Sequence, residues 1–146
     1  MKETAQKLTA AIDDFLNLRT SQINWDNQAA PGKWTNKQII GHLIDSAHIN
    51  LQRFVRCTYE EGFKLIYLQE EWVIAQHYHD ADITGLLKLW ELVNRQLVRV
   101  LANYPADRTQ VKCDNGRYGP SFNTVAFLAE DYIVHMQHHL NQLVKK

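Results

Sequence analysis

The chain is organised around a histidine-rich stretch at residues 131–142. It reads Asp131-Tyr132-Ile133-Val134-His135-Met136-Gln137-His138-His139-Leu140-Asn141-Gln142. On a helix, His135 and His139 lie about 40° apart around the axis, whereas His138 lies about 60° to the other side of His135. His135 and His139 also continue an apolar stripe, so both should point into the core. Such a pair consists either of hydrogen-bonded core histidines or of metal ligands.

Length and composition indicate a single globular domain and make several kinds of partner unexpected. The 146 residues suit one domain, residues 1–146, and 45% of them are hydrophobic, which suffices for a sizeable core. The 16 basic and 16 acidic residues balance, so neither nucleic acid nor an anionic membrane is expected as a partner. No apolar run approaches the roughly 20 residues of a membrane span, and no signal-peptide core is visible. We therefore expect a soluble, cytoplasmic protein in which Cys57 and Cys113 form no disulfide.

Apolar residues at helical spacing predict four long helices. The start of the second is the clearest, because Thr35 is a good N-cap and Gln38 stands at the capping-box position. Residues 58–82 form a long, partly helical crossover, and the turn-rich loop 104–120 has room for a small hairpin. The helices are expected at residues 3–19, from Thr35 to the crossover, from Asp82 or Thr84 to Pro105, and from Ser121 or Asn123 nearly to Lys146.

The distances of the histidines from the ends of their helices predict the topology. His42 lies about 10 Å along the second helix from Thr35, while His139 and His135 lie about 10 and 16 Å from the C-terminal end of the last helix. These depths match only if the two helices run antiparallel. We therefore predict an all-α four-helix bundle, up-down-down-up, with the long crossover between helices two and three. The 104–120 loop then lies at the far end from the site. Candidate mouth residues are Trp25, Trp34, Trp72, Gln76 and His77.

A metal site is the chemical hypothesis that these positions support. Three neutral imidazoles, from His42, His135 and His139, would leave coordination positions open for water or substrate, as in catalytic metal sites. Zinc fits such a set well, and nickel, iron and manganese also accept imidazole. Asp45 follows His42 by three residues. It can accept the second ring N–H of His42, or it faces solvent.

The same residues resemble the DinB-like superfamily, whose members are also described as YfiT-like metal-dependent hydrolases. The resemblance covers the whole chain and implies an up-down-down-up bundle with metal ligands at His42, His135 and His139. Many relatives have a glycine where this chain has Asn141. The motifs that carry the resemblance are Trp34-Thr35, Ile39-Ile40-Gly41-His42-Leu43-Ile44-Asp45-Ser46 and the stretch Asp131 to Gln142.

The resemblance also implies a class of function. Some relatives are thiol S-transferases that use bacillithiol or a related low-molecular-weight thiol, and more distant ones are mycothiol-dependent isomerases. We therefore expect a metal-dependent thiol S-transferase or hydrolase, a divalent metal such as zinc or nickel, a small-molecule substrate and a homodimer. The alternative is a non-catalytic metal-binding or stress-related bundle. His138 is expected to support the ligands, to lie at the rim or to pack in the bundle rather than to bind the metal. Asp131, a weak fourth ligand at most, and Gln142 either support the site or face solvent.

Overall fold

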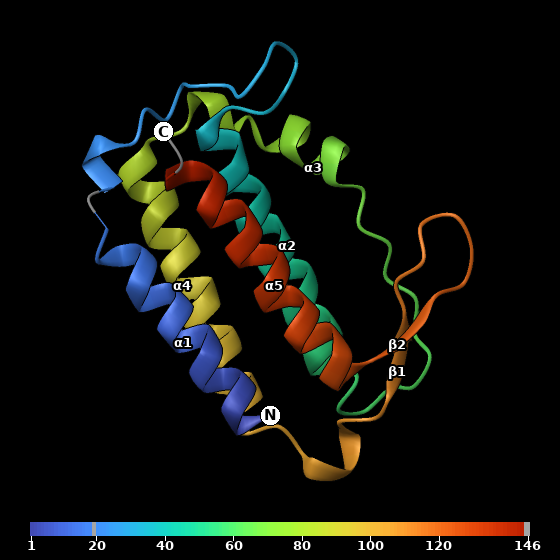
Figure 1. The fold of residues 1–146 in the computed structure, drawn as a ribbon. Helices are drawn as coiled ribbons and strands as arrows, with labels where there is room; N and C mark the ends of the chain where they lie inside the picture. The colour runs from blue at the N-terminus through green and yellow to red at the C-terminus, as the bar shows by residue number, and fades with distance from the viewer. Residues whose placement is uncertain (19, 145–146) are drawn as a thin grey trace.

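The computed structural model describes residues 1–18 and 20–144. Its four long helices form an up-down-down-up bundle, as predicted, with α1 and α5 running opposite to α2 and α4 (Figure 1). The long helices are α1 (Lys2–Leu16), α2 (Asn36–Arg56), α4 (Ile83–Ala102) and α5 (Val125–Val144). The connections contain a short helix, two strands and three 3-10 turns: α3 (Gln69–Gln76), β1 (Lys112–Asp114), β2 (Phe122–Thr124), η1 (Thr20–Gln22), η2 (Tyr78–Asp80) and η3 (Ala106–Arg108).

The hydrophobic core fills the space between the long helices. Trp90 of α4 is fully buried and meets Phe15 of α1 edge to face, with ring centroids 5.2 Å apart. Cys57 and Cys113 are buried and free. No helix in the described part of the chain is both long enough and apolar enough to cross a membrane.

Helix α2 is the central helix of the fold, and it begins at the predicted cap. The Thr35 hydroxyl accepts a hydrogen bond from the Gln38 N–H at 3.1 Å, and the Gln38 side-chain oxygen accepts one from the Thr35 N–H at 2.9 Å. Every residue from 40 to 47 is buried. This burial arises because α2 packs against α4 and α5 on one side and against the crossover on the other.

The crossover between α2 and α4 is partly helical, as predicted, since it contains α3. Before α3 the chain is extended over residues 63–68, where buried or half-buried side chains alternate with exposed ones. After α3, Tyr78 packs so closely on α2 that a Cβ atom added to Gly41 would overlap its ring. The glycine in α2 therefore permits the crossover to lie directly on the central helix.

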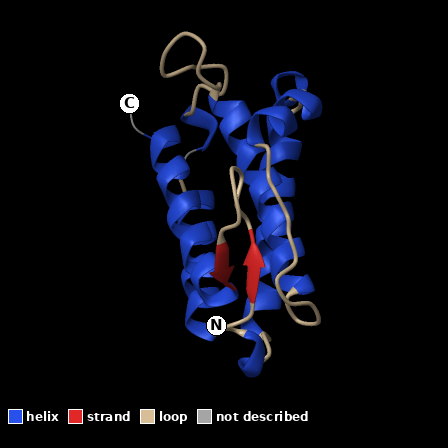
Figure 2. Cartoon of the chain, turned by 90° about the vertical axis from the view of Figure 1, so that its right-hand side faces the viewer, coloured by secondary structure: helices blue, strands red, loops and turns tan. Residues whose placement is uncertain are grey.

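A hairpin joins α4 to α5 (Figure 2), and it changes where the last helix begins. The prediction that Ser121 or Asn123 opens this helix is wrong, because β2 pairs antiparallel with β1 and α5 starts only at Val125. Thr124, the last residue of β2, accepts a hydrogen bond from the Phe127 N–H at 3.2 Å through its hydroxyl. The side chain thus caps the start of α5.

Other helix boundaries agree with the sequence to within about a turn. Helix α1 ends at Leu16, before the predicted end at residue 19, which itself lies outside the described residues. Asp82 caps α4, since its carboxylate accepts a hydrogen bond from the Gly85 N–H at 2.7 Å. The predicted end of the last helix near Lys146 also lies outside the described residues.

Candidate metal centre

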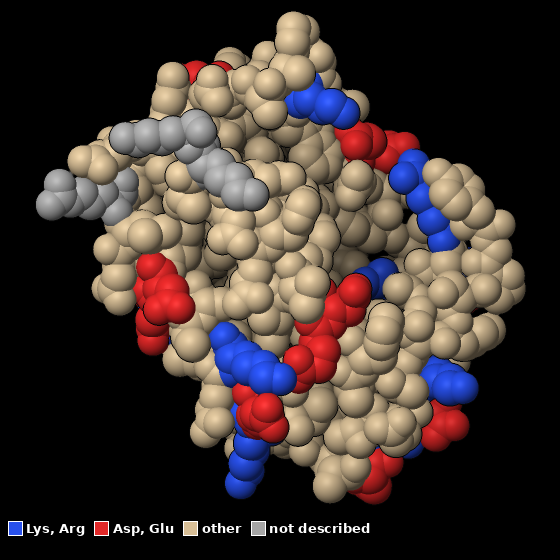
Figure 3. Space-filling view, in the orientation of Figure 1, with Lys and Arg blue, Asp and Glu red and all other residues tan. Residues whose placement is uncertain are grey.

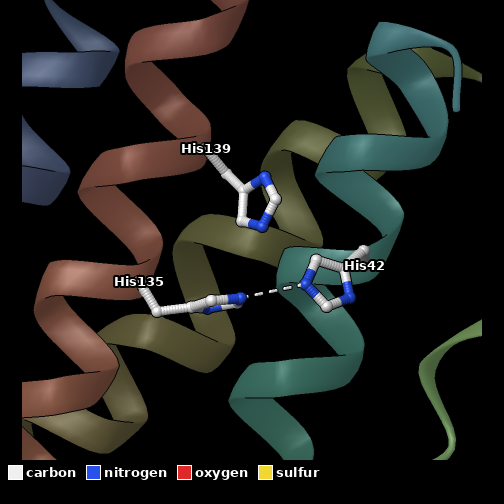
Figure 4. A group of neighbouring side chains, drawn as sticks. All are labelled: His42, His135 and His139. Atoms are coloured by element: carbon white, nitrogen blue, oxygen red, sulfur yellow. Dashed lines mark hydrogen bonds between the residues drawn. The ribbon is translucent and has the colours of Figure 1, made fainter. Parts of the chain in front are cut away.

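Helices α2 and α5 lie side by side and bring together the three histidines that the sequence singles out (Figure 4). His42 comes from α2, and His135 and His139 come from successive turns of α5. The Nε2 atoms of His42 and His135 are 3.2 Å apart. One potential ligand atom from each residue lies within 4.8 Å of the other two. His42 is buried and the other two are half-buried, so the centre is reached from one side.

Hydrogen bonds from neighbouring side chains orient two of the rings. Nδ1 of His42 lies 2.9 Å from the Tyr67 hydroxyl, and Nδ1 of His139 lies 3.0 Å from the side-chain oxygen of Gln142. Gln142 also donates to Nε2 of His138 at 3.0 Å. When Nδ1–H donates in this way, the Nε2 lone pair of each ring is free to bind a metal. His138 thus lies outside the cluster, as predicted, and Gln142 takes the supporting position.

The three imidazoles are uncharged at neutral pH. Burial, together with repulsion from His135 and His139 when they carry a proton, lowers the pKa of His42 to about 3. Burial and the charge of His139 lower the pKa of His135 to about 4, although Asp131 acts in the opposite direction. The pKa of His139 is also lowered, mainly by burial. Because a metal ion binds the neutral form of imidazole, all three lone pairs are available at pH 7.

The spacing of the rings suits a metal ion. In a tetrahedral zinc site, nitrogens bonded at about 2.0–2.1 Å lie roughly 3.3 Å from one another. The separation of 3.2 Å between the His42 and His135 nitrogens is close to that value. The His139 ring completes the triangle, with its centroid 5.0 Å from that of His42 and 4.7 Å from that of His135. Three such ligands leave at least one coordination position open.

Aromatic rings cover one side of His42. The Trp34 ring lies 4.9 Å from the imidazole, and the Tyr67 ring stacks on it at 5.8 Å. Trp72 in turn meets Tyr67 edge to face at 5.8 Å. These apolar surfaces limit the access of water to His42 and hold its ring between the start of α2 and the crossover.

A cavity of about 150 Å³ adjoins the histidines and follows α2 toward its C-terminal half, with α5 as its other wall. Figure 3 shows this face hollowed between α5 and the hairpin. Asn115, which directly follows β1, lines the cavity, so the prediction that the whole 104–120 loop lies at the far end is wrong. The reason is that β1 runs beside the crossover, where the Leu65 N–H donates to the Asp114 carbonyl at 3.0 Å. The end of β1 is thereby placed beside the cavity.

The predicted mouth is also corrected. Trp34 lies beside His42 and Trp72 beside Tyr67, but neither lines the cavity. Gln76 is exposed and donates a hydrogen bond to Asp45 instead. The remaining two candidates are also placed elsewhere: His77 is exposed, and Trp25 packs against the core. The cavity follows α2 away from the histidines, between α2 and α5, rather than toward the predicted rim residues.

The two candidate carboxylates are both placed away from the imidazoles. Asp45 is fully buried, and its Oδ1 accepts hydrogen bonds from the Tyr78 hydroxyl at 2.5 Å and from Gln76 at 3.3 Å. Both alternatives for Asp45 are wrong, because Tyr67 lies at Nδ1 of His42 and the buried Asp45 does not face solvent. Asp131 is exposed and lines the cavity, but it makes no hydrogen bond to a histidine within the described residues.

Sequence reasoning did not identify two residues around the cavity. Tyr67 belongs to the extended segment 63–68, and the short apolar run at residues 65–68 was the available signal for a buried segment. Arg53 lies eleven residues after His42, close to three helical turns, so both occupy the same face of α2. A charged residue at that spacing on the core-facing side of a helix was the available signal for Arg53.

Comparison with known proteins agrees with this architecture. The sequence profile of the DinB superfamily matches residues 2–143. The chain belongs to the DinB superfamily. One superfamily structure, YfiT from Bacillus subtilis, is described as a probable metal-dependent hydrolase with an unusual four-helix bundle topology. It superposes with a TM-score of 0.79 at 20% sequence identity, covering 97% of this chain and 81% of YfiT. The comparison with curated protein sequences finds no significant match.

Proposed function

We propose that this DinB superfamily protein holds a divalent transition metal ion through His42, His135 and His139 and acts as a metal-dependent enzyme. The observation that supports it is the convergence of three neutral imidazoles beside a cavity. Zinc and nickel are the metals that we place first. The reaction would be of the thiol S-transferase or hydrolase type, on a small molecule of a size that the cavity admits.

A metal ion held there would lower the pKa of a thiol or water bound to it, which supplies a nucleophile near neutral pH. The protein contributes orientation and shape. Tyr67 and Gln142 keep the Nε2 atoms of His42 and His139 directed inward. Trp34 limits water on one side of His42, while the cavity leaves room for substrate on the other.

Metal analysis of protein purified without a histidine tag tests the site. We expect about one transition-metal ion per chain in the wild type and its loss in His135→Ala. His138→Ala is the matched control, because His138 is on the same helix but outside the cluster, and this variant should keep its metal. A wild-type protein free of transition metal, or a His135→Ala variant that keeps it, would rule out the site.

Turnover requires a separate measurement. Electrophilic substrates are offered with a panel of low-molecular-weight thiols, and hydrolysable substrates are offered with water, before and after treatment with a chelator. Activity that disappears with the metal and returns on its addition supports the enzyme. Stoichiometric metal without any turnover would instead favour the non-catalytic metal-binding bundle. The homodimer stays a prediction, which light scattering after size-exclusion chromatography can test.

A further inference from the structure

A row of polar side chains runs along α2 from the histidines to the other end of the cavity. His42, Ser46, Asn50 and Arg53 follow one another at steps of four, four and three residues, so they share one face of the helix. All four are buried and line the cavity. A buried polar face of this length is unusual in a bundle helix, where the inward stripe is normally apolar.

Arg53 is the cation of this row, and it is incompletely satisfied. Only 8% of its surface is exposed. Nη1 donates to the side-chain oxygen of Asn50 at 3.3 Å, and Nη2 donates to the Leu65 carbonyl at 3.2 Å. These contacts use two of the five N–H donors of a guanidinium. Nε is buried and has no hydrogen-bond partner among the residues that the structure describes.

No carboxylate of the described chain neutralises Arg53. The ion pairs within 4.0 Å do not include it. Asp131 lines the same cavity but is exposed, and its charge only partly offsets the burial that lowers the pKa of Arg53. A buried guanidinium without a counter-ion is unfavourable, and donors left over beside an open cavity favour the binding of an anion there.

We propose that Arg53 binds the carboxylate of a small substrate whose other end reaches the histidines along the polar face of α2. This inference rests on the proposed function, because it assigns the substrate class of the same site. A carboxylate matches the planar fork of a guanidinium, which it can engage through two parallel hydrogen bonds. A phosphate fits less well, because Arg53 is the one lysine or arginine in the described lining and Asp131 would repel a second negative charge.

The size of the cavity limits this substrate. Its volume of about 150 Å³ is comparable to a cavity that holds benzene, so the enclosed part of the ligand is small. Linear mercaptoalkanoic acids of increasing chain length therefore serve as probes. Their thiol can bind at the metal and their carboxylate at Arg53. The matched mercaptoalkanamides differ only in charge.

The first experiment measures the affinity of the metal-loaded protein for both series by calorimetry. At the best chain length we expect the wild type to prefer the acid over the amide by roughly 10- to 100-fold, the range for a charge-assisted hydrogen bond. Arg53→Met should abolish the preference, and Arg53→Lys should restore part of it. Equal affinity of the wild type for acid and amide at every length would overturn the proposal.

The second experiment tests the carboxylate site independently of the metal site. It uses only the wild-type protein, so its result does not depend on whether a variant folds. Metal-free wild-type protein is titrated with propionate while the arginine Nε–H signals are followed by NMR. We expect the Arg53 signal to move with propionate but not with propionamide. If it does not move, the carboxylate site is wrong even where metal is bound. If it moves in a protein that binds no metal, only the proposed function fails. Tighter binding of inorganic phosphate than of propionate would also overturn the carboxylate assignment.

Discussion

A hydrogen bond between Nδ1 of His42 and the Tyr67 hydroxyl, at 2.9 Å, orients the His42 ring toward the other two histidines. We predict that Tyr67→Phe weakens metal affinity roughly 10- to 100-fold, the usual effect of removing such a supporting partner. Competition with a chromogenic chelator measures the change. Tyr59→Phe is the matched control, because Tyr59 is 67% exposed, and it should leave the affinity unchanged. Equal affinity in wild type and Tyr67→Phe would show that the bond does not orient the ligand.

Gly41 allows the Tyr78 ring to lie directly on the surface of α2. We predict that Gly41→Ala destabilises the fold by about 1–3 kcal/mol, because the added methyl group overlaps the ring. Gly85→Ala in α4 is the matched helical control, since its Cβ would meet only ordinary contacts. That change should stabilise the protein by up to about 1 kcal/mol. Urea denaturation of both variants measures the difference, and changes of the same sign would contradict this reasoning.

At the level of elements, the capping box fixes where α2 begins and therefore where Trp34 lies over His42. We predict that Thr35→Ala costs about 1–2 kcal/mol of unfolding free energy, because the helix loses its N-cap acceptor. Thr84→Ala, an exposed threonine in the first turn of α4, should change stability by less than about 0.5 kcal/mol. Comparable losses in the two variants, measured by urea denaturation, would argue against the cap.

The elements also show what the sequence could predict and what it could not. Helical periodicity and the depths of three histidines were enough for the bundle, its topology and the convergence of His42 with α5. The crossover was harder, because residues 65–68 are all apolar and show no alternation that marks which side chains face α2. The position of the hairpin was missed because its strands are only three residues long and because β1 lies beside the crossover, a segment distant in the chain. Cavity residues such as Asn115 depend on that pairing.

For the whole molecule, the buried histidines predict a loss of stability in acid when no metal is bound. In the unfolded chain the pKa of His135 is about 6.5, whereas in the folded protein it is about 4. Between these values the unfolded state binds more protons, so stability falls as pH falls, by at most about 1.4 kcal/mol per pH unit for this residue.

The comparison of wild type with His135→Gln isolates this effect, because the contributions of the carboxylates cancel in the difference. Both proteins are treated with a chelator and unfolded with urea at pH 8, 7, 6, 5 and 4. We expect the wild type to lose stability relative to the variant below about pH 6.5. Parallel curves over the whole range would show that His135 is not held neutral by the fold.

The antiparallel arrangement of α2 and α5 also determines whether folding or metal binding comes first. His42 and His135 are 93 residues apart in the chain, so an unfolded chain almost never presents them together. An ion that joins them would bind the folded chain and leave on unfolding, so it would stabilise the fold by mass action, by about 4 kcal/mol at a free-ion concentration of about 1,000 times its Kd. Its ligands meet only after the last helix has docked. The ion would therefore bind late, to a bundle that has already formed.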